Sequence, residues 1–300
     1  AHQGVTINPI RNRYQVPDSL QRQWSARSYH GSVEHNARAV INRYLGYWDG
    51  NPTTLIPLSP EDSAPLYVDM MGGAGPILAK ASALVEDGQY LLATEILDKL
   101  VHAEPDNGDA KRLLADAFEQ LGYQQESPSV RNSFLAGALE LRSGIPEGAA
   151  PKSSGPDLTR ALSTGQFLDF LGIRLRSDLA AGREFTVNLV TPDTGETFVV
   201  ELSNATLTNL AGFQAADPTL TMTVNRADLE QAMNGQRTVP ELIADGRLRL
   251  EGDASVLQVL AESMVHFELG FEILPGTGTG QISEQLADFQ AEPLADSSGG

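Results

Sequence analysis

The sequence predicts a multidomain protein in which an all-α half is followed by an α+β half. A chain of 300 residues is long for a single hydrophobic core. Apolar residues recur at helical spacing through residues 75–142, whereas residues 184–212 alternate apolar and polar side chains. Between these regions, the stretch SGIPEGAAPKSSGPD (143–157) is rich in Gly, Pro and Ser, as a domain linker is.

The first half is expected to be a lead-in (1–27) and a helical domain (28–145). A short helix is expected near VPDSLQRQWSAR, with Pro17 in its first turn. The pattern of residues 33–48 predicts a longer helix, which the DGNP turn at 49–52 ends. Further helices follow, with breaks at DG (87–88) and PDNG (105–108). Their layout resembles a tetratricopeptide-type helix pair, which buries its apolar face only against a neighbour.

The second half is expected to be a linker (146–157), an α+β domain (158–275) and a mostly disordered acidic tail (276–300). A helix is expected in TRALSTGQFLDFLGIRL, and the alternation on both sides of DTGE predicts a hairpin. The strand TLTMTV is expected to precede a helix capped by Asn225 or Asp228. The strand LRLEGD then leads into a closing amphipathic helix that extends to Phe271.

The net charge of −18 argues against partners that attract basic surfaces, namely nucleic acids and anionic membranes. No apolar run reaches the roughly 20 residues of a membrane-spanning helix. The absence of cysteine excludes disulfides and thiol catalysis and leaves the compartment open. No leader segment is visible before an Ala start, which processing or fragmentation would explain.

A metal site was the first chemistry to consider, because His30, Glu34 and His35 lie close together in the chain. A catalytic zinc site needs three or more converging His or carboxylate ligands, and no HxH or HExxH pattern occurs. Histidines five residues apart do not share one face of a helix. We therefore expect no metal ligands, with the histidines hydrogen-bonded within the fold; a two-histidine pair is the alternative.

Motifs for nucleophilic catalysis and phosphate binding are also missing, since neither GxSxG nor SxxK nor GxGxxG occurs. The GGAG stretch at 72–75 precedes a helix, so an anion could bind there, but a plain helix start is the simpler interpretation. The sequence therefore predicts no catalytic residue in this chain.

Large apolar residues gather in two expected helices of the second domain. They either cover a sheet or line a tunnel for an alkyl chain, and periodicity does not separate a filled core from a hollow one. The residues are Phe167, Phe170, Leu171, Leu257, Leu260, Met264, Phe267 and Phe271.

One stretch, YHGSVEHNARAVINRYLGYWDGNP (29–52), resembles the tract that follows the catalytic domain in alkyl sulfatases of the metallo-β-lactamase superfamily. MGGAGPILAKA, FEQLGYQQES and RNSFLAGALELRSG agree with that family in order. FLGIRL, DTGE, ADPTLTMT and LRLEGD resemble its sterol-carrier-like last domain. The chain departs from the family pattern at His30, at Ile41 and around Tyr47–Trp48, which puts substrate preference in doubt.

The resemblance implies a helical dimerisation domain and a sterol-carrier-protein-2-like domain for the alkyl tail. It also implies a two-zinc catalytic domain, covalent or separate, whose HxHxDH motif is absent here. Zinc is thus expected in that domain and no cofactor in this chain. The partners expected are a second copy, that catalytic domain, and an alkyl sulfate or another long-chain lipid. A periplasmic or secreted location is favoured by the family alone.

Within this resemblance, the first tract is expected to close the neighbouring catalytic pocket at the sulfate end. Arginines hold sulfates or pair with acids, and Tyr, His and Asn donate hydrogen bonds. An equally supported interpretation is that these side chains only fix their helix. The candidates are Tyr29, His35, Asn36, Arg43 and Tyr44, with Arg38 as a further arginine.

The function that follows is the dimerisation and alkyl-chain-binding portion of an alkyl sulfatase. The intact enzyme would hydrolyse alkyl sulfate esters to alcohol and sulfate, and a zinc-bound water is a suitable nucleophile for it. Two other classes remain open at this stage. One is a stand-alone lipid-binding or lipid-transfer protein of the sterol-carrier type, and the other is a helical scaffold that only oligomerises.

Overall fold

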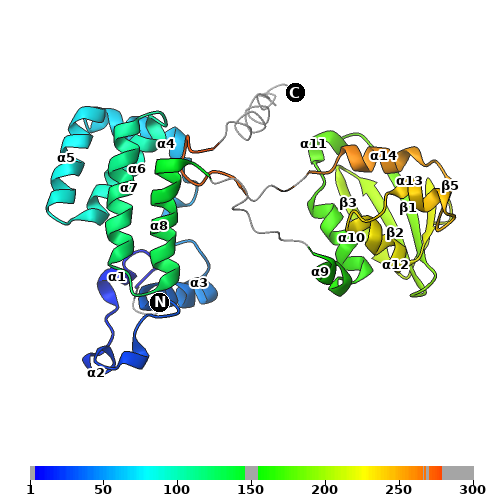
Figure 1. Ribbon diagram of the computed structural model, residues 1–300, viewed down its shortest axis with the longest axis horizontal. Coiled ribbons are helices and arrows are strands. Elements are labelled where there is room, and N and C mark those ends of the chain that lie inside the picture. The colour runs from blue at the N-terminus through cyan, green and yellow to red at the C-terminus, as the bar shows by residue number, and fades with distance from the viewer. Residues whose placement is uncertain (1–3, 146–154, 266, 268–269, 279–300) are drawn as a thin grey trace. The chain divides into compact units, whose positions relative to one another are not determined.

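The structure is a computed structural model that describes residues 4–145, 155–265, 267 and 270–278. It divides into two compact units (Figure 1). The helical unit comprises the described residues up to 145 together with 270–278. The sheet unit comprises the described residues from 155 to 267. No helix among the described residues is long and apolar enough to cross a membrane.

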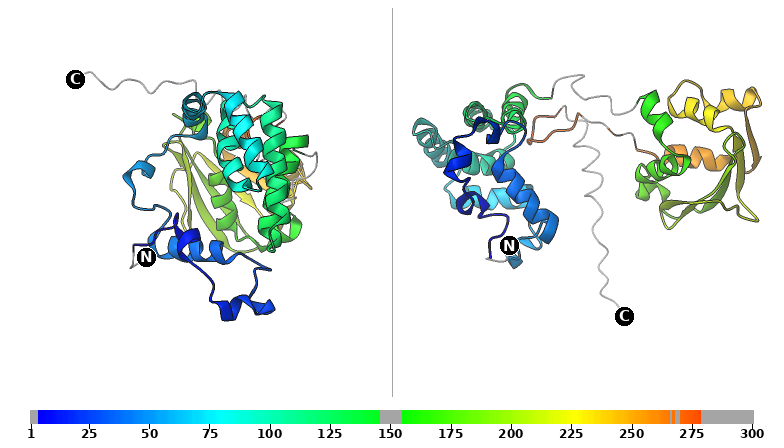
Figure 2. Two further views of the ribbon diagram at one scale, coloured as in Figure 1. Left: turned by 90° about the vertical axis from the view of Figure 1, so that its left-hand side faces the viewer. Right: turned by 90° about the horizontal axis from the view of Figure 1, so that it is seen from below.

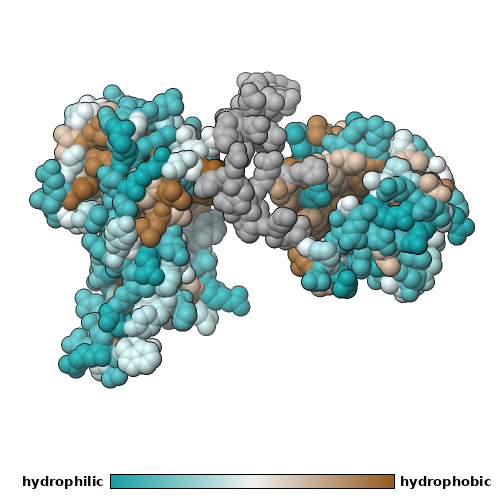
Figure 3. Space-filling view, viewed as in Figure 1, coloured by the Kyte–Doolittle hydropathy of each residue, from teal (hydrophilic) through white to brown (hydrophobic). Residues whose placement is uncertain are grey.

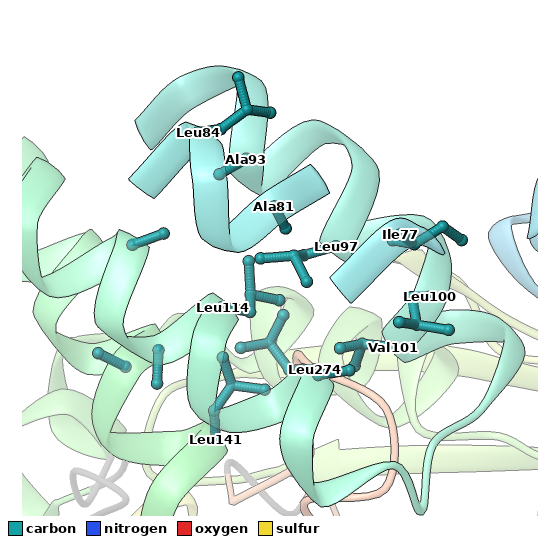
Figure 4. Packing of buried hydrophobic residues seen from close by; sticks show 14 of the residues in the cluster. Ile77, Ala81, Leu84, Ala93, Leu97, Leu100, Val101, Leu114, Leu141 and Leu274 are labelled. Atoms are coloured by element: carbon teal, nitrogen blue, oxygen red, sulfur yellow. The ribbon is translucent and has the colours of Figure 1, made fainter. Parts of the chain in front are cut away.

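The core of the helical unit consists of consecutive helices that pack side by side. They are α4 (Pro60–Met70), α5 (Ala74–Glu86), α6 (Tyr90–Ala103), α7 (Gly108–Tyr123) and α8 (Pro128–Ser143). The predicted breaks are confirmed: Gly88 has a φ of +71° after α5, and the Asn107 side chain accepts a hydrogen bond from the Ala110 amide where α7 begins. The apolar faces of these helices meet in one buried cluster (Figure 4). Whether the helices form a tetratricopeptide-type pair stays a prediction.

Shorter elements precede this core. They are α1 (Ile10–Arg13), α2 (Asp18–Gln21), the 3-10 turn η1 (Trp24–Ala26), α3 (Val33–Leu45) and η2 (Pro52–Thr54). The helix predicted for 33–48 ends earlier than expected, because Gly46 adopts a φ of +84° directly after Leu45. Pro17 precedes α2, as the sequence predicts.

The sheet unit is built on a mixed five-stranded sheet with the order β3-β2-β1-β4-β5. The strands are β1 (Phe185–Thr191), β2 (Glu196–Ser203), β3 (Thr206–Ala211), β4 (Leu220–Val224) and β5 (Leu248–Gly252). Strands β1 and β4 are parallel, and the other neighbours are antiparallel. Alternate residues of β2, namely Phe198, Val200 and Leu202, are buried, so one face of the sheet is covered.

Helices gather on that face of the sheet (Figure 2). They are α9 (Pro156–Ala161), α10 (Thr164–Ile173), α11 (Ser177–Ala180), α12 (Arg226–Met233), α13 (Val239–Ala244) and α14 (Ser255–Glu262). Helix α9 includes the last two residues of the predicted linker, 156 and 157. The helix predicted in 159–175 is divided at Ser163, whose hydroxyl accepts from the Gln166 amide and starts α10. A helical half followed by a mixed α and β half is confirmed.

Strand β3 was not predicted as a separate element. Asn204 and Ala205 both have positive φ, near +50° and +55°, and form a tight two-residue turn that returns the chain beside β2. The sequence signal there is weak, because Ala is an unusual residue for this backbone conformation.

The cap of α12 differs from the expectation. Neither Asn225 nor Asp228 caps this helix with its side chain. Asp193, in the β1–β2 turn, accepts hydrogen bonds from the Arg226 and Ala227 amides at 2.7 and 3.2 Å. Asp228 is instead buried and pairs with Arg247 at 2.6 Å.

The end of the described chain also differs from the expectation. The closing helix α14 ends at Glu262, not near Phe271. Residues 270–278 belong to the helical unit, where Leu274 joins the buried cluster. The predicted domain end at 275 therefore divides a segment that folds as one piece. The predicted disordered tail lies outside the described residues from 279 onward.

Candidate functional site

Helix α3 carries most of the predicted sulfate-end residues and lies at the surface. None of its 13 residues is buried, although its sequence is amphipathic. Val40, Tyr44 and Leu45 are all exposed, and so are Tyr47 and Trp48 just beyond it. Burial of apolar area normally supplies most of the stability of such a helix. Helix α3 therefore presents apolar side chains that no other described element of the chain buries.

The five predicted residues do not converge on one point. Asn36 and Arg43 are seven residues apart, which is about two helical turns, so they share a side of α3. His35 and Tyr44 are separated by about two and a half turns and point to opposite sides. Tyr29 precedes the helix and is exposed. Of the four predicted residues on α3, Asn36 and Arg43 share a side of the helix, about two turns apart.

Arg38 and Arg43 have different environments on α3. Arg38 is half-buried and donates to the Glu34 carboxylate from Nε and Nη2 at 3.2 and 3.0 Å. Arg43 is exposed and has no hydrogen bond or ion pair with any described residue. An unpaired guanidinium is able to bind an anion in the bidentate manner of arginine. Arg43 is therefore the better sulfate-binding candidate of the two.

The DGNP turn after α3 is held rigidly by its own side chains. Asp49 accepts hydrogen bonds from the Thr54 hydroxyl at 2.6 Å, the Asn51 amide at 3.0 Å and the Asn8 side chain at 2.7 Å. The Thr54 hydroxyl and these other donors hold the pKa of Asp49 below its ordinary value. Trp48 Nε1 donates to the Asn51 carbonyl oxygen at 3.0 Å. This turn fixes the direction in which the chain leaves α3.

Metal binding finds no support in the part of the chain that the structure describes. No three His, Asp or Glu side chains there are grouped so as to hold a metal ion. His30 and His35 are both exposed, whereas His102 Nδ1 lies 2.8 Å from the Asp98 carbonyl oxygen, a hydrogen bond within its own helix. The residues present do not fit the zinc centre that the resemblance implies for the catalytic domain.

The predicted alkyl-chain residues divide into three groups. Those that are partly buried pack against the core of the sheet unit, as a filled core would: Phe167, Leu171, Leu257, Leu260 and Met264. Phe170 and Phe267 are exposed on the sheet unit, with ring centroids 6.3 Å apart in an edge-to-face arrangement. Phe271 is exposed too, but it belongs to the helical unit, whereas the other seven belong to the sheet unit.

Arg174 is a further member of this surface that the sequence analysis missed. Its guanidinium carbon lies 5.8 Å from the Phe170 ring centroid, within cation–π range. Its Nε donates to the Val265 carbonyl oxygen at 2.8 Å and ties α10 to the segment that follows α14. Ile173 beside it is exposed as well. No sequence signal separates this arginine from the others, because the Val265 carbonyl oxygen that it binds lies 91 positions away in the chain.

The chain thus combines an all-α helical unit with an α/β sheet unit that exposes aromatic side chains. Apolar surface is visible on both units in Figure 3. The family model for alkyl sulfatase dimerisation matches residues 6–144, and the model for the alkyl sulfatase C-terminal domain matches residues 152–276. The chain belongs to the alkyl sulfatase family and carries its dimerisation and C-terminal domains.

Relatives with known activity support this assignment. A linear primary-alkylsulfatase from Pseudomonas is 37% identical over 91% of this chain, and an alkyl/aryl-sulfatase from Saccharomyces cerevisiae is 35% identical over 92%. The chain spans only 41% and 42% of their lengths. The solved structure of a stereoselective inverting sec-alkylsulfatase from Pseudomonas aligns with a TM-score of 0.85 at 36% identity. That alignment covers 91% of this chain and 43% of that one.

Proposed function

We propose that this chain provides the dimerisation and alkyl-chain-binding portion of an alkyl sulfatase. The intact enzyme hydrolyses alkyl sulfate esters, and a zinc-bearing domain of the metallo-β-lactamase type supplies the reaction. The observation that carries the proposal is helix α3, which is amphipathic yet has no buried residue. Its exposed Val40, Tyr44 and Leu45 fit a cover by another domain better than they fit water.

The covering domain, on this proposal, is the catalytic one. Arg43 then points its unpaired guanidinium toward the sulfate group, and Asn36 on the same side donates a hydrogen bond to it. Tyr44 lies further round the helix and packs against the covering domain, not against the sulfate. Bound zinc would supply an activated water or hydroxide in that domain, and the residues of this chain would bind and orient the ester.

The alkyl tail, in this proposal, lies on the exposed aromatic surface of the sheet unit. Phe170 and Phe267 provide apolar area, and the Arg174 guanidinium lies over the Phe170 ring. A fold of the sterol-carrier type for this unit and a homodimer formed through the helical unit belong to the same proposal. The match of residues 6–144 to the family model for alkyl sulfatase dimerisation supports the homodimer.

Alkyl binding can be tested with a non-hydrolysable alkyl sulfonate, kept below its micelle concentration, and 13C-methyl methionine NMR. The chain has five methionines, and Met264 is the reporter nearest the proposed surface, whereas Met70 and Met71 lie in the helical unit. We expect the Met264 resonance to shift while Met70 and Met71 stay in place. Equal shifts of all methionines, or none, would contradict alkyl binding at this surface.

A matched pair of variants sharpens that experiment. Phe267 and Leu210 have similar exposed fractions, 54% and 55%, but only Phe267 contacts Phe170. Phe267→Ala should weaken sulfonate binding about tenfold, which corresponds to about 1.4 kcal/mol. Leu210→Ala should leave the affinity unchanged.

Catalysis is tested by dodecyl sulfate hydrolysis with the purified chain and added zinc. We expect no hydrolysis, because the described residues hold no cluster that fits a metal. Hydrolysis that persists through repurification and disappears with chelation would place the reaction in this chain and overturn the proposal. In that case His30, Glu34 and His35 would be the first residues to replace.

A further inference from the structure

The segment Glu272–Gly278 lies on the helical unit although the sheet unit precedes it in the chain. Leu274 is only 9% exposed and belongs to the same buried cluster as the helix residues around it. Figure 4 shows its side chain among those of Leu114, Leu141 and Val101. Its neighbour Ile273 is 69% exposed, whereas Thr277 further along the segment is buried like Leu274.

One carboxylate on α8 binds the backbone of this segment. Glu140 Oε1 accepts hydrogen bonds from the Ile273 and Leu274 amides at 2.8 and 2.9 Å. The Thr277 hydroxyl lies 2.7 Å from the same oxygen and 2.6 Å from the Leu274 carbonyl oxygen. Two backbone amides on one charged oxygen form the stronger kind of hydrogen bond. Glu140 is therefore an anchor for this segment and not a solvent-facing helix residue.

The other end of the segment fits just as closely. Lys111 Nζ donates to the Gly276 carbonyl oxygen at 2.7 Å. Gly276 has a φ of +70°, and a Cβ there would lie 2.8 Å from the Pro105 carbonyl oxygen, so only glycine fits. Directly after α8, a Cβ at Gly144 would lie 3.0 Å from the Thr277 carbonyl oxygen, and its φ is +72°.

We propose that the helical unit contains a peptide-docking groove, formed by α7, α8 and the turn before α7, whose ligand is the segment Glu272–Gly278 of the same chain. This docked segment, here called the clip, attaches the sheet unit to the helical unit a second time, after the covalent connection through residues 146–154. An attachment at both ends limits the separation of two linked units and raises their effective concentration. The clip does not depend on what either unit binds.

Hydrogen–deuterium exchange on the full chain tests the docking directly. The amides of Ile273 and Leu274 donate to Glu140, and those of Thr277 and Gly278 donate to Glu272. We expect their exchange to be slower than free-peptide rates by about tenfold or more, at every protein concentration. Free-peptide rates in the unaltered chain would overturn the proposal. Protection that disappears on dilution would also overturn it, because the groove would then hold another copy's segment.

Variants then test whether the clip limits the separation of the units. The chain has no cysteine, so Asp87→Cys and Thr208→Cys, both at exposed positions, allow a distance label on each unit. Leu274→Asp puts a charge into the groove and should broaden the label-to-label distance distribution, whereas Ile273→Asp should not change it. An unchanged distribution in Leu274→Asp would overturn the tether.

A second variant distinguishes release of the clip from unfolding of the helical unit. Glu140→Ala removes the anchor from the groove and leaves Leu274 and the rest of the buried cluster intact. It should raise the exchange rates of Ile273 and Leu274 about tenfold while the amides in the middle of α6 stay protected. Unchanged exchange at Ile273 and Leu274 would show that Glu140 does not hold the clip.

Discussion

Helices α7 and α12 differ in how far along the chain the residue that caps each of them lies. Helix α7 is capped by the residue before it, Asn107, whose side chain accepts from Ala110 at 3.0 Å. Helix α12 is capped by Asp193, which lies 33 residues earlier in the chain. The start of α7 is therefore set by a neighbouring residue, whereas the start of α12 depends on a contact with a distant one.

Buried side chains show the same difference. In the helical unit, α6 buries Ala93, Leu97, Leu100 and Val101, at the spacing its own sequence repeats. In the sheet unit, the buried Arg226 of α12 donates to the carbonyl oxygens of Thr159, which lies in α9, and of Leu162, which directly follows α9. Helix α3 is a third case, because its local pattern is helical but its apolar side chains stay exposed. The local sequence pattern thus determines that a helix forms, and only tertiary contacts determine which residues bury its apolar face.

The largest expected effect comes from a cavity in the locally organised core. Leu97→Ala should lower the free energy of unfolding by about 3 kcal/mol, because Leu97 is fully buried. Val40→Ala on α3 should cost less than about 0.5 kcal/mol in the same chain, because Val40 is exposed. Urea unfolding followed by circular dichroism measures both. A similar loss for Val40→Ala would mean that α3 is covered within this chain.

The next effect concerns the buried arginine of the sheet unit. Arg226→Met should cost about 2 kcal/mol, since it leaves the Leu162 and Thr159 carbonyl oxygens without their donor. Arg142→Met is the matched control in the helical unit, where the guanidinium pairs with Asp116 and Glu119 on a half-exposed surface. Its cost should stay below about 1 kcal/mol. Equal losses in the free energy of unfolding, measured with urea, would show that the buried Arg226 contributes no more stability than the half-exposed Arg142.

A smaller effect comes from the distant cap. Asp193→Ala should cost about 1 kcal/mol, because the Arg226 and Ala227 amides lose their acceptor. Asn225→Ala, at the N-cap position itself, should cost almost nothing, since its side chain makes no capping bond. Thermal unfolding of the two variants side by side gives the comparison. A larger loss of stability for Asn225→Ala than for Asp193→Ala would show that Asn225 caps α12, as the sequence predicts.

The smallest effect is a pH dependence at the turn after α3. The pKa of Asp49 is below its ordinary value of 3.8, so its hydrogen bonds contribute stability above that pH. The contribution is lost as the pH falls through the lowered pKa. Amide exchange at Asn51 should therefore keep its protection at pH 5 and lose it only as the pH falls below the ordinary pKa of 3.8. Asp49→Asn should abolish this pH dependence, and an unchanged profile would show that Asp49 does not hold the turn.

Much of the helical core could be predicted because its signals are local. The breaks at residues 87–88 and 105–108 and the start of α8 follow from Gly, Pro and Asn in the chain itself. Of the candidate site, the sequence identified the tract 29–52 and its candidate residues, but only the structure shows that His35 and Tyr44 point to opposite sides of α3. It found Phe170 and Phe267 but not Arg174, whose hydrogen bond to Val265 joins residues 91 positions apart.

The sequence by itself determined the helical first half, the hairpin at DTGE and the likeness to alkyl sulfatases, since each depends on residues close together in the chain. Only the tertiary structure decided that Asp193 caps α12, that β4 lies parallel to β1, and that residues 272–278 return to the helical unit. The physical reason is the range of the contacts. Periodicity and turn chemistry act within a few residues, whereas Glu140 meets Leu274 across 134 positions and leaves no local pattern.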